Sequence, residues 1–128
     1  MAYTVVSGHP RVDILASEVS ALATRAAGTH STEYGTLKAW CDSHIGDTIG
    51  SLSMLYLGWH MEAYGFVYLI EEELGNDGTT YSDRAKALMD AMVWDYSGIG
   101  NYDAKKAFAR AFDWIYPELS SEEKAALK

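Results

Sequence analysis

The sequence is poor in residues on which several protein classes depend. It has one cysteine, Cys41, among 128 residues, which excludes an internal disulfide framework and indicates a reducing compartment. We therefore expect a cytoplasmic protein. The first ten residues lack the basic region and apolar run of a targeting peptide, so we also expect no removable leader there.

Basic residues are scarce as well. The chain has 10 Lys and Arg against 18 Asp and Glu, a formal net charge of −8. The excess acid is central, since residues 59–103 hold nine acids and two bases. Direct nucleic-acid binding needs clustered cations at the phosphates, and the one tight cluster is Lys105, Lys106 and Arg110. We therefore expect no direct nucleic-acid binding, and a protein partner with a basic surface.

No stretch shows the period-two alternation of a half-buried strand, an internal repeat or low complexity. Apolar residues recur at helical spacing instead, and 48% hydrophobic residues supply an ample core. We predict an all-α bundle, one domain over residues 1–128, with five main helices and a short C-terminal helix.

Caps and breakers predict the helix boundaries. The predicted N-terminal residues or caps are Pro10, Thr32, Ser51, Thr80, Asn101 and Ser120. The predicted stops are Gly28, Gly46, Leu74, the segment SGIGN at 97–101, and Pro117. On the fourth helix we expect Tyr81, Ala85, Leu88, Met89, Met92 and Tyr96 to point inward. On the fifth, Asp113 is expected on the solvent side.

The segment near residues 51–74 is predicted to be the central hydrophobic helix. On a helical wheel it has two apolar stripes on nearly opposite sides. The first stripe is Leu55, Tyr56, Trp59, Ala63, Phe66, Val67 and Ile70. The second is Leu57, Met61, Tyr64 and Tyr68. A helix apolar on two sides is surrounded by other helices, so we expect Trp59 in the core and a close backbone approach at Gly58 and Gly65.

A membrane span is the competing interpretation, since Leu52 to Ile70 is long enough. Glu62 lies near its midpoint and would cost about 3 kcal/mol on insertion, His60 adds to that cost, and the flanks lack Lys and Arg. We therefore expect no membrane association.

Few residues suggest chemistry. Cys41 and His44 lie three apart on one predicted helical face, where a thiolate and an imidazole could bind metal or activate a nucleophile. No CxxC, HExxH or paired ExxH motif completes such a site, and burial on an apolar face explains both residues. We expect no enzyme activity, cofactor or metal site. A ligand- or metal-binding bundle that uses Cys41, His44 or His60 remains an alternative.

Acidic residues and one tryptophan are the candidate partner-binding residues. Three glutamates end the central helix, where negative charge opposes the helix dipole by about 0.3–1 kcal/mol, and this cost suggests a binding role. Trp94 is predicted to lie opposite the core stripe of the fourth helix, among carboxylates, as in a binding hot spot. The alternative is that the tail helix or the segment before Pro10 folds over Trp94 and covers it. The predicted set is Glu71, Glu72, Glu73, Asp83, Asp90 and Trp94.

The segment AFDWIYPELSSEEKAAL, Ala111 to Leu127, resembles helix-turn-helix segments of α/α-toroid polysaccharide-processing enzymes. The resemblance covers 17 of 128 residues, and the chain is too short for a toroid. No catalytic residue of that family maps onto it, so the resemblance implies no activity.

Three function classes follow from these observations. We expect foremost a protein-binding inhibitor or adaptor, because a small, acidic, helical chain is similar in type to virus- or plasmid-encoded anti-defence factors that block nucleic-acid-handling complexes. The alternatives are a structural subunit of a homo-oligomer or virion, and the ligand- or metal-binding bundle.

Overall fold

The computed structural model describes residues 8–10, 12–92 and 99–126 of the chain, and within these ranges it contains helices and no strand. The prediction of an all-α fold with five main helices and a short C-terminal one is confirmed. The helices are α1 (Val19–Ala27), α2 (Ser31–His44), α3 (Met54–Glu73), α4 (Thr79–Asp90), α5 (Ile99–Trp114) and α6 (Ser121–Ala126), with 3-10 turns at Ala16–Glu18, Ile49–Ser51 and Tyr116–Glu118.

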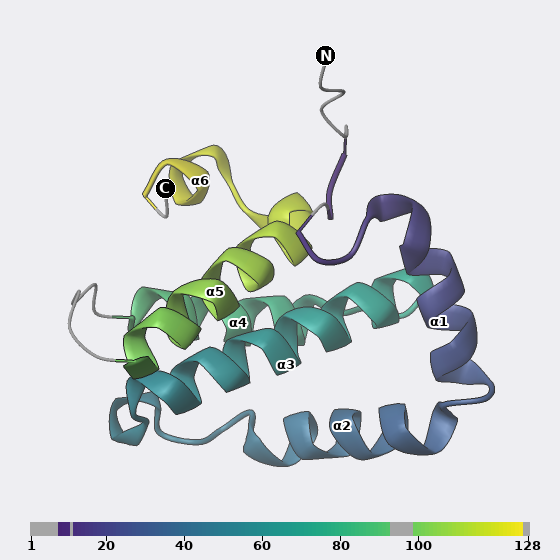
Figure 1. Ribbon diagram of the computed structural model, residues 1–128, viewed down its shortest axis with the longest axis horizontal. Coiled ribbons are helices and arrows are strands. Elements are labelled where there is room, and N and C mark those ends of the chain that lie inside the picture. Colours follow the sequence, from purple (N-terminus) through teal and green to yellow (C-terminus); the bar gives the residue numbers. More distant parts are fainter. Residues whose placement is uncertain (1–7, 11, 93–98, 127–128) are drawn as a thin grey trace.

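Helix α3 is the centre of the bundle, as predicted. It contacts α1, α2, α4 and α5, and Figure 1 shows it running through the middle of the molecule with α1 across one end. Its buried residues include the whole second apolar stripe: Leu57, Met61, Tyr64 and Tyr68. None of the helices in the described ranges is long and apolar enough to cross a membrane.

Glycines set the close packing of α3 against α5. A Cβ atom on Gly58 would lie 3.0 Å from the Cα of Ala104, and one on Gly65 would lie 3.3 Å from the Cα of Ala111. Gly58 and Gly65 are seven residues apart, and so are Ala104 and Ala111. Small residues therefore face small residues at two successive levels of the contact between α3 and α5. The predicted close approach at the two glycines is confirmed.

The first helix begins later than predicted, because the residues before it are bonded to side chains at the end of α5 and are not helical. The Asp113 carboxylate accepts a hydrogen bond from the Val12 N–H (2.8 Å) and pairs with His9, and the Trp114 indole N–H donates to the Val12 carbonyl (3.1 Å). These contacts hold the segment along α5. Pro10 therefore lies outside any helix, and α1 starts at Val19 and ends before Gly28 as expected.

Asp113 is also a correction to the predicted solvent face of α5. Its exposed fraction is 3%, and its carboxylate is the anchor for the N-terminal segment. The helical spacing had placed it with Lys106 and Arg110, opposite the apolar stripe of the helix. The structure instead buries it with donors from a segment about a hundred residues away in sequence.

The remaining boundaries differ from the predictions by one to three residues, except that α4 ends at Asp90, well before the predicted stop at 97–101. Helix α4 starts at Thr79 rather than being capped by Thr80, since the Asp77 carboxylate accepts the Thr79 N–H at 2.9 Å. Helix α5 starts at Ile99, so Asn101 lies inside it. The Ser120 and Glu123 capping box is confirmed, with bonds of 2.7 and 3.1 Å. The core residues predicted for α4 are buried, except Tyr96, which lies outside the described residues.

Candidate functional site

The N-terminal part of one flank of α3, between α2 and α5, is not covered by another helix in the described part of the chain. Tyr56 and Trp59 are 51% and 53% exposed there, and Ala63 and Phe66 further along the same flank are half-buried. The prediction that Trp59 belongs to the core is therefore wrong. We call these four residues, Tyr56, Trp59, Ala63 and Phe66, the α3 stripe.

The stripe is exposed because α1 is too short to cover all of α3. Ile70, two turns beyond Ala63 on the same flank, packs against Ala23 and Ala26 of α1 and is fully buried. Helix α1 spans nine residues, about 14 Å, and crosses only the C-terminal end of α3, as Figure 1 shows. The N-terminal half of that flank is left to solvent or to a partner.

Two aromatic rings project from the exposed end of the stripe. Tyr56 and Trp59 meet edge to face, with ring centroids 5.3 Å apart, so each ring restrains the other. Large apolar side chains that are exposed together, and not singly, are typical of binding surfaces. Tyrosine and tryptophan are also the residues most enriched among interface hot spots.

A charged wall flanks the aromatic end. Beside Trp59 lies a shallow pocket of about 170 Å³, lined by Trp59, Glu62, Asp103, Lys106, Ala107 and Arg110. The Arg110 guanidinium pairs with both Glu62 and Asp13, so its charge is already compensated. Asp103 makes no hydrogen bond or ion pair with any described residue, and the Lys106 ammonium lies 4.4 Å from the centroid of the Tyr102 ring.

An apolar groove continues the stripe at its other end. Its volume is about 290 Å³, and its lining residues are Leu22, Arg25, Ala26, His30, Glu33, Tyr34, Leu37 and Phe66. Helices α1 and α2 form its walls, and Phe66 belongs both to the groove and to the stripe. The side chains of Arg25 and Glu33 form no hydrogen bond or ion pair within the described ranges. An apolar groove with one unpaired charge of each sign at its rim therefore adjoins the exposed aromatic rings.

Of the predicted acidic residues, Glu71 is structural. It is 7% exposed, and its carboxylate accepts hydrogen bonds from the phenol of Tyr34 (2.6 Å) and the side-chain amide of Asn76 (3.1 Å). Burial and this bond to Glu71 raise the pKa of Tyr34. Glu71 thus ties α2 and the α3–α4 turn to the central helix, and it has no surface to offer a partner.

The other four predicted acidic residues are exposed but dispersed. Glu72 accepts the Gly78 N–H at 2.7 Å, and Asp83 lies 3.8 Å from the Lys86 ammonium. Asp90 is seven residues beyond Asp83, about 10 Å along α4. Glu73 is exposed at the end of α3, and Trp94 lies outside the described residues. The structure does not gather the five described acidic residues into one site.

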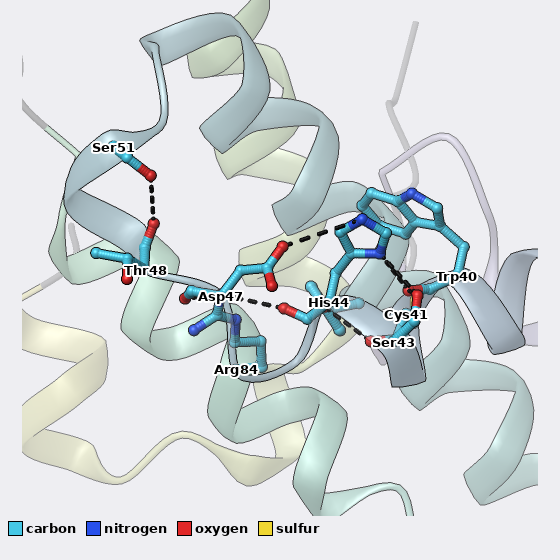
Figure 2. A network of polar contacts seen from close by, with 9 residues as sticks. Trp40, Cys41, Ser43, His44, Asp47, Thr48, Ser51 and Arg84 are labelled. Carbon is cyan, nitrogen blue, oxygen red and sulfur yellow. Dashed lines mark hydrogen bonds and ion pairs between the residues drawn. The ribbon is translucent and has the colours of Figure 1, made fainter.

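Two of the residues considered for metal or thiol chemistry, Cys41 and His44, lie near the end of α2 (Figure 2). Cys41 is fully buried, and burial raises the pKa of its thiol to about 12, which opposes thiolate chemistry. His44 stacks on Trp40 with centroids 4.5 Å apart, and Arg84 bonds to the Asp47 carbonyl at 2.7 Å. No group of three or more His, Cys, Asp or Glu in the described ranges is arranged to hold a metal.

His60 is the unusual residue of this region. It is 6% exposed, its Nδ1 atom has no hydrogen-bond partner among the described residues, and its ring lies edge-on to Trp40 at 4.7 Å. Burial lowers the pKa of His60, and the nearby His44 and Arg84 lower it further, whereas Asp47 acts in the opposite direction. The neutral imidazole is therefore the form that fits the folded protein.

Acidification is expected to destabilise the protein through His60. In the unfolded chain His60 binds a proton near pH 6.5, whereas in the folded protein it does so only at lower pH. The stability that neutral His60 contributes is therefore fully present above about pH 6.5 and is lost as the pH falls below that value. The measurement is the melting temperature between about pH 7.5 and 5.5. His60→Gln should flatten the dependence, while His30→Gln at an exposed position should not. An unchanged slope in His60→Gln would contradict the assignment.

The chain was compared with protein-family models, with curated proteins and with solved structures, and none of the three comparisons gave a match.

Proposed function

We propose that this protein acts by binding other protein chains through the α3 stripe, as an inhibitor or adaptor and not as an enzyme. The observation that carries the proposal is the exposure of Tyr56 and Trp59 on the central helix, whose other flanks are packed. About half of each side chain remains in water. Covering them would contribute on the order of 1 kcal/mol each from apolar burial, before any specific contact.

Charge supports a basic partner surface. The formal net charge is −8, and Glu72, Glu73, Asp83 and Asp90 are exposed. Opposite charges on a partner would accelerate association at low salt. Complexes that handle nucleic acids carry such basic surfaces, so an anti-defence role in the cytoplasm is the specific form of the proposal.

Affinity capture with a matched pair of variants tests the proposal. The chain, Trp59→Ala and Leu74→Ala are used as baits at equal concentration, because Leu74 is also exposed but lies beyond the stripe. We expect Trp59→Ala to lose a bound protein that the other two retain, since truncating a hot-spot aromatic costs about 2 kcal/mol or more. Identical proteins on all three baits would contradict a binding role for the stripe.

A homo-oligomeric subunit is the second candidate. It is favoured by the presence of exposed rings and an apolar groove on one face of the same helix.

A further inference from the structure

We infer that the end of α2 and the connection after it, residues 40–53, form an acid-sensitive latch that moves away from α3 when His60 binds a proton. Helices α3, α4 and α5 stay packed against one another when the latch is released. The inference goes beyond the proposed function, because no residue of the α3 stripe takes part in it. It also differs from a loss of global stability, because one segment opens while the rest of the fold remains.

The first argument is that the folded protein has no acceptor for a second hydrogen on the His60 ring. His60 is 6% exposed, and its Nδ1 atom has no hydrogen-bond partner among the described residues. In the neutral ring Nδ1 can be the nitrogen that carries no hydrogen, so one acceptor is left unpaired. The cation carries a hydrogen on both nitrogens, so protonation makes Nδ1 a buried donor without an acceptor. An unpaired donor on a buried charged group costs more than an unpaired neutral acceptor.

The second argument is the charge around His60. The titratable and charged side chains that face it come from α2, the connection, α3 and α4: His44, Asp47, Tyr64 and Arg84. Burial lowers the pKa of His60, and His44 and Arg84 lower it further. Asp47 acts in the opposite direction, but its carboxylate is half-exposed and lies 4.0 Å from the Nε2 atom of His44. Tyr64 is neutral near pH 6, since burial raises its pKa to about 12. A protonated His60 therefore has no ion-pair partner among the described residues.

The third argument is that the latch is the part of these surroundings that can move. It touches His60 through Trp40, whose ring meets the imidazole edge to face with centroids 4.7 Å apart. Helix α2 has one fully buried side chain, Cys41, and residues 46–48 of the connection are exposed. Helix α3, in contrast, packs along both α4 and α5.

A few polar bonds hold the latch in place. The Nη2 atom of Arg84 donates to the Asp47 carbonyl at 2.7 Å, which Figure 2 shows, and the Tyr64 phenol donates to the Cys41 carbonyl at 2.9 Å. Each of these donors and acceptors can bond to water instead when the segment moves away. Release of the latch therefore hydrates the His60 cation without separating α3 from α4 or α5.

Hydrogen exchange of the native protein between about pH 7.5 and 5.5 tests the inference, after correction for intrinsic exchange rates. His60 binds a proton near pH 6.5 in the released form and only at lower pH in the closed form. The population of the released form therefore rises by up to about tenfold for each pH unit below about 6.5. We expect the protection of amides in residues 40–53 to fall severalfold by pH 5.5, while that of amides in α5 stays unchanged.

Two histidine variants identify the titrating group. His60→Gln removes the proton site, so the protection of residues 40–53 should no longer depend on pH in this range. His44→Gln is the matched control, because His44 is half-exposed and stacks on Trp40 from within the latch itself. The pH dependence should persist in His44→Gln. A dependence that persists in His60→Gln as well would overturn the assignment to His60.

Two further outcomes overturn the inference, and neither needs a variant. One is a loss of protection at pH 5.5 that is equal in all helices, since it would mean global unfolding without a latch. The other is a His60 ring that is protonated, as seen from its NMR resonances, while residues 40–53 keep their full protection. Both outcomes leave the binding function of the α3 stripe untouched, because that function is tested by Trp59→Ala at neutral pH.

Discussion

Tyr64→Ala is expected to lower the free energy of unfolding by about 3–5 kcal/mol, the usual cost of deleting a large buried aromatic side chain. Tyr64 is fully buried in the middle of α3, and its phenol donates a hydrogen bond to the Cys41 carbonyl at 2.9 Å. The truncation leaves a cavity and an unpaired carbonyl at the contact between α2 and α3. Chemical denaturation followed by circular dichroism measures the loss.

Two variants separate the contributions in that experiment. Tyr64→Phe keeps the ring and removes the donor, and it should cost about 1 kcal/mol. Trp59→Ala removes a larger ring five residues earlier on the same helix, but from a position that is 53% exposed, so it should cost less than about 1 kcal/mol in dilute solution. If Trp59→Ala costs as much as Tyr64→Ala, the stripe is covered in the monomer.

Gly58→Ala is expected to destabilise the protein by about 1–3 kcal/mol, the usual cost of overpacking. Alanine favours helix over glycine, but its Cβ would lie 3.0 Å from the Ala104 Cα and 3.2 Å from the Ala107 Cβ. The closest atom is main chain and cannot turn aside as a flexible side chain would. Helix α5 must therefore shift, which loosens the largest helix contact in the bundle.

Gly35→Ala is the matched control, since Gly35 lies within α2 and a Cβ there would meet no atom within 4 Å. The same substitution should stabilise the protein by about 0.5–1 kcal/mol through backbone entropy and helix propensity. We therefore expect Gly58→Ala to lower the free energy of unfolding and Gly35→Ala to raise it. A stabilising Gly58→Ala would mean that α3 and α5 do not pack as closely as described.

The sequence predicted the parts of the fold that depend on local periodicity. The central position of α3, the close approach at Gly58 and Gly65, and the inward face of α4 follow from spacing along a single helix. The spacing of apolar residues along one helix does not show how many other helices pack around it. The first stripe of α3 was as apolar as the second, and only the short length of α1 decides that Trp59 remains exposed.

Polar residues were assigned less successfully, because their partners are distant in sequence. Glu71 was assigned to a binding surface, but its carboxylate binds Tyr34, 37 residues earlier. Pro10 was assigned to a helix start, whereas Asp113 holds that segment along α5. The groove was missed altogether, since its walls come from α1, α2 and α3 and no motif marks it. Such sites arise from tertiary contacts that a single sequence does not display.

The attachment of α2 has a consequence for the groove. Within the described ranges, α2 has one fully buried side chain, Cys41. Its other core contacts come from half-buried side chains, Tyr34, Leu37 and Trp40, and from polar bonds such as Tyr34 to Glu71 and Tyr81 to Asp42. Helices held by few apolar contacts open locally at lower free energy than the rest of a fold. Since α2 forms one wall of the groove, that wall is the adjustable one, and the groove can widen to admit a side chain without unfolding the bundle around α3.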